Sequence, residues 1–102
     1  MKTPKPSDFP EIQRVFTAYL HEDFLDEYGT PVAALRAFHD DANASERRRF
    51  SAEMRRFLER TVTLDFNELR AVIARLGCRW SPRSRTALVT LLTEAANLDS
   101  EL

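Results

Sequence analysis

Apolar residues recur every three or four positions along most of the chain, and charged residues fill many of the positions between them. This spacing places the apolar side chains on one face of an α-helix. Strand signals are almost absent, because runs of alternating β-branched residues are rare and only two glycines occur. We therefore predict an all-α protein that folds as a compact single-domain bundle of about five amphipathic helices.

The first predicted helix begins near Asp8, a residue that suits the N-cap position. Pro10 falls in the first turn, where its missing N–H costs nothing, and Phe9 is expected to pack onto that turn. The apolar stripe of this helix consists of Ile12, Val15, Phe16, Tyr19 and Leu20. The acidic segment 21–28 follows, and we expect Gly29 to end it in a turn or C-cap with positive φ.

Two more helices are predicted in the middle of the chain. One has Thr30 as its N-cap and Pro31 as its first residue, and it stops around Asp40. Its inward-facing residues are Val32, Leu35 and Phe38. The other is capped by Asn43 or Ser45. Its apolar stripe consists of Phe50, Met54, Phe57 and Leu58.

The last two predicted helices occupy the C-terminal third of the chain. Asp65 and Glu68 have the spacing of a capping box, and Gly77 marks the end of the helix that they open. Its buried face consists of Leu69, Val72, Ile73 and Leu76. The final helix begins between Ser81 and Ser84. Its apolar stripe consists of Leu88, Leu91, Leu92 and Ala95.

Length and composition favour one globular domain. The 102 residues are 43% hydrophobic and 30% charged, which is typical of a folded soluble domain. We expect residues 1–7 to be a flexible N-terminal segment and residues 8–102 to form the domain. No run approaches the roughly 18 apolar residues of a membrane span, and none follows the N-terminal lysines as in a secretory signal. The single cysteine, Cys78, cannot form an internal disulfide, which agrees with a reducing compartment.

Charge is unevenly distributed although the net charge is only −1. Residues 1–46 hold nine acids and four bases, a balance of −5, whereas the remaining residues hold seven acids and eleven arginines, a balance of +4. If the two parts pack side by side, they create oppositely charged faces of the kind that steer binding partners. The alternative is that both sets of charges are solvated helix faces.

The densest group of titratable residues lies in the acidic segment. It contains His21 and the four carboxylates of Glu22, Asp23, Asp26 and Glu27. On a helix His21 and Asp23 would point about 200° apart, which does not suit shared metal ligation. Asp23 and either Asp26 or Glu27 would share one face, where like charges repel unless a cation or a basic partner lies between them. The segment is therefore a solvated turn, a partner-binding patch, or a metal or catalytic site.

Arginines dominate the outer face of the third predicted helix. They are Arg47, Arg48, Arg49, Arg55, Arg56 and Arg60. Such a patch could bind nucleic acid, because it neutralises phosphates and releases counterions. However, Arg49 and Arg56 have the spacing to pair with Glu53, and no aromatic platform accompanies them. We therefore interpret the face as solvated and ion-paired, with a small helical nucleic-acid-binding regulator as the alternative.

No motif for catalysis is present. The sequence lacks a nucleophile with a base and an orienting residue, a phosphate-binding glycine loop and an HExxH pattern. Cys78 follows the predicted end of a helix, where the dipole raises a thiol pKa, so we expect a small core residue. Trp80 is expected to fill the return loop. We predict that the protein is not an enzyme and uses no cofactor and no metal.

Four short motifs, in their order and spacing, resemble those of the small helical immunity proteins of bacterial contact-dependent growth inhibition systems. They are Phe9-Pro10-Glu11-Ile12, Tyr19-Leu20-His21-Glu22-Asp23-Phe24, Glu27-Tyr28-Gly29-Thr30 and Leu76-Gly77-Cys78-Arg79-Trp80. In the second motif, phenylalanine, glutamine and tryptophan of the family pattern are replaced by Leu20, Glu22 and Phe24. The resemblance covers residues 8 to about 80, and the last helix departs from the family because it follows quickly and contains no tryptophan.

The resemblance implies a cytoplasmic antidote. Such proteins bind the C-terminal toxin domain that a neighbouring cell delivers, commonly a nuclease that cuts RNA, tRNA included, or DNA. They occlude the active site or the substrate groove of the toxin. The resemblance also implies a monomer that forms a 1:1 heterodimer with the toxin and binds neither membrane nor nucleic acid directly.

Acidic residues suit this partner, because a nuclease must bind phosphates and tends to be basic. We expect the toxin to bind at Glu22, Asp23, Phe24, Asp26, Glu27, Asp40 and Asp41. Complementary charge would raise the association rate, and aromatic and arginine anchors at the centre of the patch would add specificity. Phe24 and Tyr28 are either such anchors or core residues; helix and turn geometry favours the core for Tyr28 and leaves Phe24 open.

Overall fold

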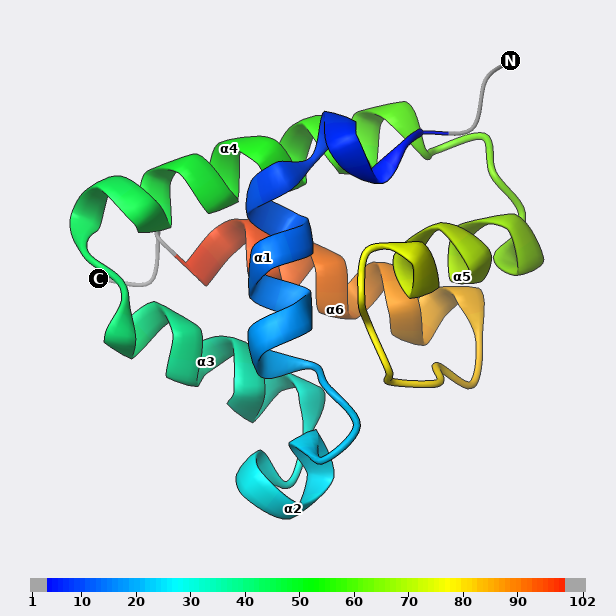
Figure 1. The fold of residues 1–102 in the computed structure, drawn as a ribbon. Coiled ribbons are helices and arrows are strands. Elements are labelled where there is room, and N and C mark those ends of the chain that lie inside the picture. Colours follow the sequence, from blue (N-terminus) through cyan, green and yellow to red (C-terminus); the bar gives the residue numbers. More distant parts are fainter. Residues whose placement is uncertain (1–3, 99–102) are drawn as a thin grey trace.

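The computed structural model describes residues 4–98 of the chain. This part contains six α-helices and one 3-10 turn, joined by connecting segments (Figure 1). Their bounds are η1 Pro6–Asp8, α1 Pro10–Tyr19, α2 Phe24–Tyr28, α3 Pro31–Asp41, α4 Ala44–Arg60, α5 Phe66–Arg75 and α6 Arg85–Asn97. No strand occurs within residues 4–98, so the predicted all-α fold is confirmed. Of the predicted N-terminal segment 1–7, residues 1–3 lie outside the described part.

Local side-chain hydrogen bonds define four helix starts as predicted. The hydroxyl oxygens of Thr30 and Ser84 each accept a backbone N–H from three residues later, at 3.1 Å. Asn43 and Asp65 each form a reciprocal capping box with a glutamate three residues later. Asn43, and not Ser45, is therefore the N-cap of α4. Because each bond spans only three residues, the sequence alone can reveal it.

The start of α1 differs from the prediction. Phe9 is the N-cap residue, whereas Asp8 ends η1 and accepts the backbone N–H of Lys5 at 3.3 Å. Phe9 is fully buried, and its ring packs edge-on against Phe57 with 5.0 Å between the ring centroids. The prediction that Asp8 caps α1 is therefore wrong, because packing against α4 sets where α1 begins.

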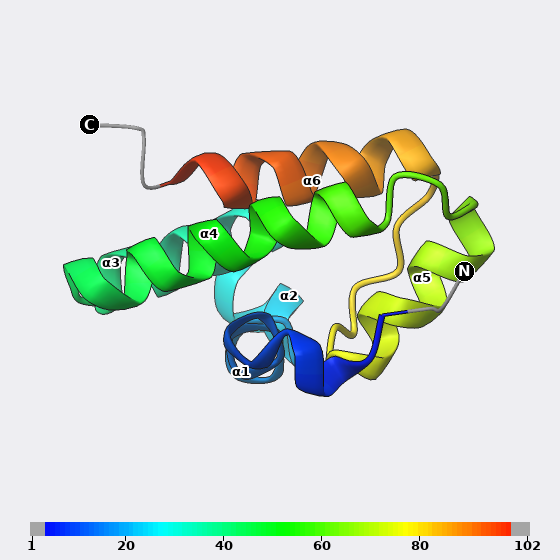
Figure 2. The ribbon, with the colours of Figure 1, turned by 90° about the horizontal axis from the view of Figure 1, so that it is seen from above.

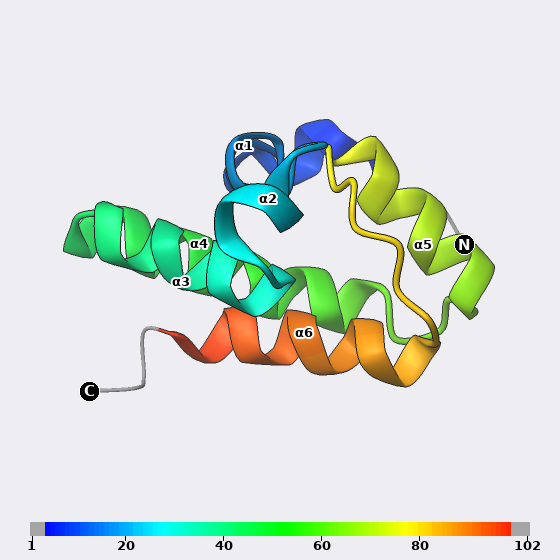
Figure 3. The same ribbon diagram turned by 90° about the horizontal axis from the view of Figure 1, so that it is seen from below.

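α3, α4 and α6 pack together as one layer, and α1 crosses this layer. α4 and α6 run antiparallel side by side, and α3 packs against α6 (Figures 1 and 2). α1 is seen almost end-on in Figure 2, where α4 and α6 lie along the picture, so α1 crosses them steeply. The short helix α2 packs on α3, and α5 lies at the end of the molecule away from the α3–α4 connection (Figure 3).

The predicted apolar stripes supply the core. All their residues are buried except Tyr19, Val32 and Leu58, which are partly buried against its edge. Cys78 is also buried, as predicted, and burial raises the pKa of its thiol to about 11. Trp80 packs partly buried against the same core.

The turn that follows α5 passes very close to α1. Gly77 has a φ of +96°, and a Cβ added there would collide with Oγ1 of Thr17 and lie 3.3 Å from the backbone N and Cα of Thr17. Two residues later, Arg79 donates its backbone N–H to the carbonyl of Leu20 at 2.8 Å. The connection between α5 and α6 is thereby fastened to the C-terminal end of α1.

Alanine substitutions at the two glycines test this close approach. Gly77→Ala is expected to lower the free energy of unfolding by about 2–4 kcal/mol, from the left-handed backbone and from overlap with α1. Gly29→Ala is the matched control, because Gly29 has a φ of +85° but no atom lies within 4 Å of an added Cβ. Its expected cost is only about 1–2 kcal/mol. Equal losses in urea denaturation would show that the contact with Thr17 contributes nothing.

Candidate functional site

Four of the predicted partner-binding carboxylates are exposed on α2 and on the turn before it. They are Glu22, Asp23, Asp26 and Glu27. Leu25 lies among them in sequence and exposes 61% of its surface. Phe24, by contrast, is only 3% exposed and belongs to the core, which corrects its assignment as a contact residue. α2 therefore packs on the core through Phe24 and exposes Leu25, whose neighbours in sequence include the acids.

His21 is engaged within this turn. Its Nδ1 accepts the backbone N–H of Asp23 at 3.0 Å, and its Nε2 lies 3.4 Å from Oε1 of Glu27. Asp26 and Glu27 lie in the first turn of α2, where the positive end of the helix dipole stabilises their negative charges. Among residues 4–98, no three His, Cys, Asp or Glu side chains are placed to hold a metal ion. The geometry is that of an exposed acidic turn.

A cleft of about 380 Å³ opens beside this turn. Glu22 and Asp23 line it together with His21, and Arg79 from the connection between α5 and α6 also lines it. The acids of the turn therefore face a cation of this chain on one side, and Arg79 offsets part of their charge there.

Two tyrosines connect α2 with the acidic end of α3. The hydroxyl of Tyr19 donates to Oδ2 of Asp41 at 2.9 Å, and its ring lies 6.1 Å from that of Tyr28. Burial and the nearby carboxylate of Glu27 raise the pKa of Tyr28. Burial and the hydrogen bond to Asp41 raise the pKa of Tyr19 to about 12, so this hydroxyl remains a donor at neutral pH. The tyrosine pair thus connects Asp41, near the end of α3, with Tyr28, the last residue of α2.

Asp40 completes this set at the end of α3. Its side chain is 83% exposed, and Oδ1 lies 4.0 Å from Nδ1 of His39. We define the acidic surface as the exposed residues Glu22, Asp23, Asp26, Glu27, Asp40 and Asp41. Sequence reasoning missed the part played by Tyr19 in this surface, because it placed Tyr19 in the core stripe of α1. Tyrosine carries a polar tip on an apolar ring, which suits the edge of a core, and this was the available signal.

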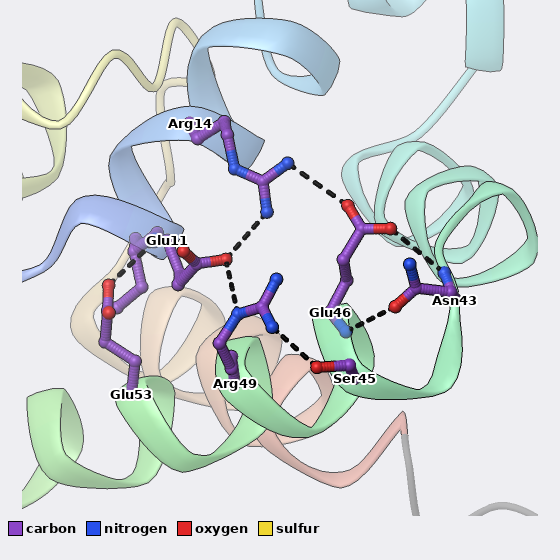
Figure 4. Close-up of polar contacts among 8 residues, drawn as sticks. Glu11, Arg14, Asn43, Ser45, Glu46, Arg49 and Glu53 are labelled. Carbon is purple, nitrogen blue, oxygen red and sulfur yellow. Dashed lines mark hydrogen bonds and ion pairs between the residues drawn. The ribbon is translucent and has the colours of Figure 1, made fainter.

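An ion-pair network joins α1 to α4 (Figure 4). Arg14 lies 2.7 Å from Glu11 and 3.3 Å from Glu46, and Arg49 lies 3.8 Å from Glu11. Glu46 also accepts the backbone N–H of Asn43, and this bond together with Arg14 holds the pKa of Glu46 below its usual value. Exposed pairs of this kind contribute little stability, so the main effect of the network is to orient its side chains.

Glu53 turns inward, and not towards Arg49 and Arg56 as predicted. It is only 6% exposed, and its Oε1 accepts the backbone N–H of Ile12 at 2.8 Å. Arg49 instead donates to Oγ of Ser45 at 2.6 Å. A carboxylate of α4 therefore satisfies an N–H in the first turn of α1, where the helix itself provides no acceptor.

Most of the predicted arginine face is used to hold neighbouring segments. Arg47 donates to the carbonyl of His39 at 2.7 Å, and Arg56 donates to the carbonyl of Asp8 at 3.1 Å. Arg60 lies 3.7 Å from the carboxylate of Asp8, and the guanidinium groups of Arg56 and Arg60 each lie 5.3 Å from the ring centroid of Phe9. These contacts favour a structural role for the face.

A comparison with known families decides what kind of protein this is. A family model described as CdiI immunity protein matches residues 8–97. The chain belongs to the CdiI immunity protein family. The match includes α6, which lies beyond the four motifs that carry the resemblance in the sequence. No curated protein and no solved structure matches the chain.

Membership of the CdiI immunity protein family implies a toxin-neutralising role in which the chain binds a cognate toxin protein. The matched range contains every residue of the acidic surface. Within the described residues, no helix combines the length and the apolar character needed to cross a membrane.

Substitutions at Glu53 test the buried contact between α4 and α1. Glu53→Ala leaves the N–H of Ile12 without its acceptor and is expected to lower the free energy of unfolding by about 1–3 kcal/mol. Glu53→Gln keeps an acceptor oxygen and is expected to cost less. An alanine variant as stable as the wild type in urea denaturation would contradict the importance of this bond.

The pH dependence of these variants follows from the same burial. Burial holds the pKa of Glu53 above its usual value, so the folded state binds this proton more tightly than the unfolded state does. The wild type should therefore gain stability relative to Glu53→Gln as the pH falls from 7 through this raised pKa, and lose it as the pH rises again. A relative loss on acidification would overturn this assignment.

Proposed function

We propose that this CdiI immunity protein neutralises a nuclease toxin domain of a contact-dependent growth inhibition effector by covering its active site or substrate groove. The observation that carries the proposal is the family match over residues 8–97. The acidic surface supports the nuclease assignment, because a nuclease binds phosphates and its groove is therefore basic. The carboxylates would occupy the places that phosphates of the substrate take.

This mode of inhibition requires no chemistry from the immunity protein. It needs a 1:1 complex in the cytoplasm that forms quickly and dissociates slowly. The exposed carboxylates would accelerate association with a basic partner, and the exposed Leu25 would add apolar contact area within the same surface.

Titration of the protein against the toxin domain encoded next to its own gene tests the proposal. We expect binding in the nanomolar range by calorimetry, and a stoichiometric loss of RNA or DNA cleavage. Absence of binding would overturn the proposal. A salt series with naked RNA and DNA then tests the alternative, because a regulator that uses the arginines of α4 would bind nucleic acid steeply less well as salt rises.

Charge reversal tests the role of the acidic surface. The double variant Glu22→Lys/Asp26→Lys is expected to weaken toxin binding at least tenfold, mainly through slower association, because it places repulsive charge against a basic partner. The matched control is Glu59→Lys/Glu94→Lys, which changes the net charge equally at exposed sites on α4 and α6. The control should remain within about threefold of the wild type. Equal affinities for the two double variants would eliminate the acidic surface as the toxin contact.

A further inference from the structure

A small cleft opens where α1, α3 and α4 meet, at the Asp41 end of the acidic surface. Its volume is about 80 Å³. Apolar side chains from α1 and α3 line it, and the exposed Ala18 forms part of its wall. Its polar lining includes Asp41 and Glu46, with Tyr19 and Arg14 beside them. A narrow cleft whose lining combines apolar side chains with carboxylates suits a long side chain that carries a positive charge at its tip.

The two carboxylates of this cleft differ in how far their oxygens are used. Both oxygens of Glu46 already have a partner within the protein, because Oε1 accepts the backbone N–H of Asn43 and Oε2 accepts from Arg14. Asp41 is exposed, and the hydroxyl of Tyr19 bonds to Oδ2. Because each carboxylate oxygen can accept two hydrogen bonds, Asp41 keeps capacity for a further donor, and Tyr19 fixes its orientation.

Electrostatics also favours a cation at this position. Asp41 is the last residue of α3, where the partial negative charge of the helix C-terminus adds to that of the carboxylate. Arg14, the cation of this chain at the cleft, is held between Glu11 and Glu46 (Figure 4). The N-terminal amides of α4, which would repel a cation, include two already satisfied by Asn43 and Glu46 in the capping box.

We propose that this cleft receives one lysine or arginine side chain of the toxin domain. The aliphatic part of that side chain lies on the apolar lining, and its charged end bonds to Asp41. This inference rests on the proposed function and adds to it a defined anchoring position within the interface. A basic side chain buried in this way would be a hot spot of the complex.

Two substitutions separate the shape of the cleft from its charge. Ala18→Leu fills the cleft without changing any charge, and Asp41→Asn removes the charge but keeps an acceptor for Tyr19. We expect each to weaken toxin binding at least tenfold in calorimetry. The matched controls are Ala71→Leu on α5 and Glu94→Gln on α6, both at exposed sites, and each should bind within about twofold of the wild type. Thermal unfolding of every variant establishes that the fold is retained.

Each outcome decides a different point. If the wild type does not bind the toxin domain, the proposed function itself fails. If the wild type binds and both cleft variants bind equally well, the cleft is not occupied and only this inference fails. If Ala18→Leu alone weakens binding, the entering side chain is not a cation. If Asp41→Asn alone weakens binding, Asp41 acts from the surface and the cleft stays empty, which also overturns the inference.

Discussion

The contact on which the rest of this fold depends is the burial of one end of α1 against α4. Glu53 supplies a carboxylate to the N–H of Ile12, and Phe9 inserts its ring against Phe57. Neither contact is local in sequence, since each joins segments more than 40 residues apart. Together they set both the starting residue of α1 and its steep crossing of α4 (Figure 2). An unsatisfied buried N–H costs about 1–3 kcal/mol, so an arrangement of α1 that removed Ile12 from Glu53 would lose about that much stability.

The far end of α1 carries the consequence for function. Tyr19 lies at the last position of α1, where it bonds to Asp41 and packs near Tyr28. The crossing of α1 over α4 therefore determines how the acids of α2 and the end of α3 are arranged. The same end of α1 is also held by the connection between α5 and α6. Gly77 lies against Thr17, and Arg79 donates its backbone N–H to the carbonyl of Leu20. α1 thus links its buried contact with α4 to the arrangement of the acidic surface.

The uneven charge of the sequence has a physical explanation in this arrangement. Arginines of α4 are largely consumed in orienting η1, α1 and α3, through carbonyls, carboxylates and the ring of Phe9. The acids of the N-terminal half are mostly left at the surface. Within the described residues, several arginines of α4 thus hold neighbouring segments in place, whereas most acids of residues 1–46 remain exposed.

The sequence was sufficient for the helix caps whose contacts span three residues. The caps at Thr30, Asn43 and Asp65, and the positive φ of Gly29, follow from short-range hydrogen bonds and backbone sterics. It was insufficient where a distant group competes for the same atoms. Asp8 failed as a cap because Phe9 is fixed by α4, and Glu53 left its neighbouring arginines because Ile12 offers a buried N–H.

The candidate site shows the same division. The exposure of Glu22, Asp23, Asp26 and Glu27 agrees with their polar character, whereas the burial of Phe24 depends on how α2 packs on α3. The cleft beside Asp41 is lined by residues of three helices, so the spacing of residues within one segment does not predict it. Sequence patterns therefore describe the residues of this surface better than its shape.

Hydrogen–deuterium exchange of the chain, alone and with the toxin domain, tests most directly which face meets the partner. We predict slower exchange in the complex over residues 14–28 and 38–42, which contain the end of α1, all of α2 and the end of α3. Residues 85–97 of α6 should exchange unchanged. Protection confined to residues 48–60 of α4, with none in α2, would contradict the account and assign the interface to the arginine face.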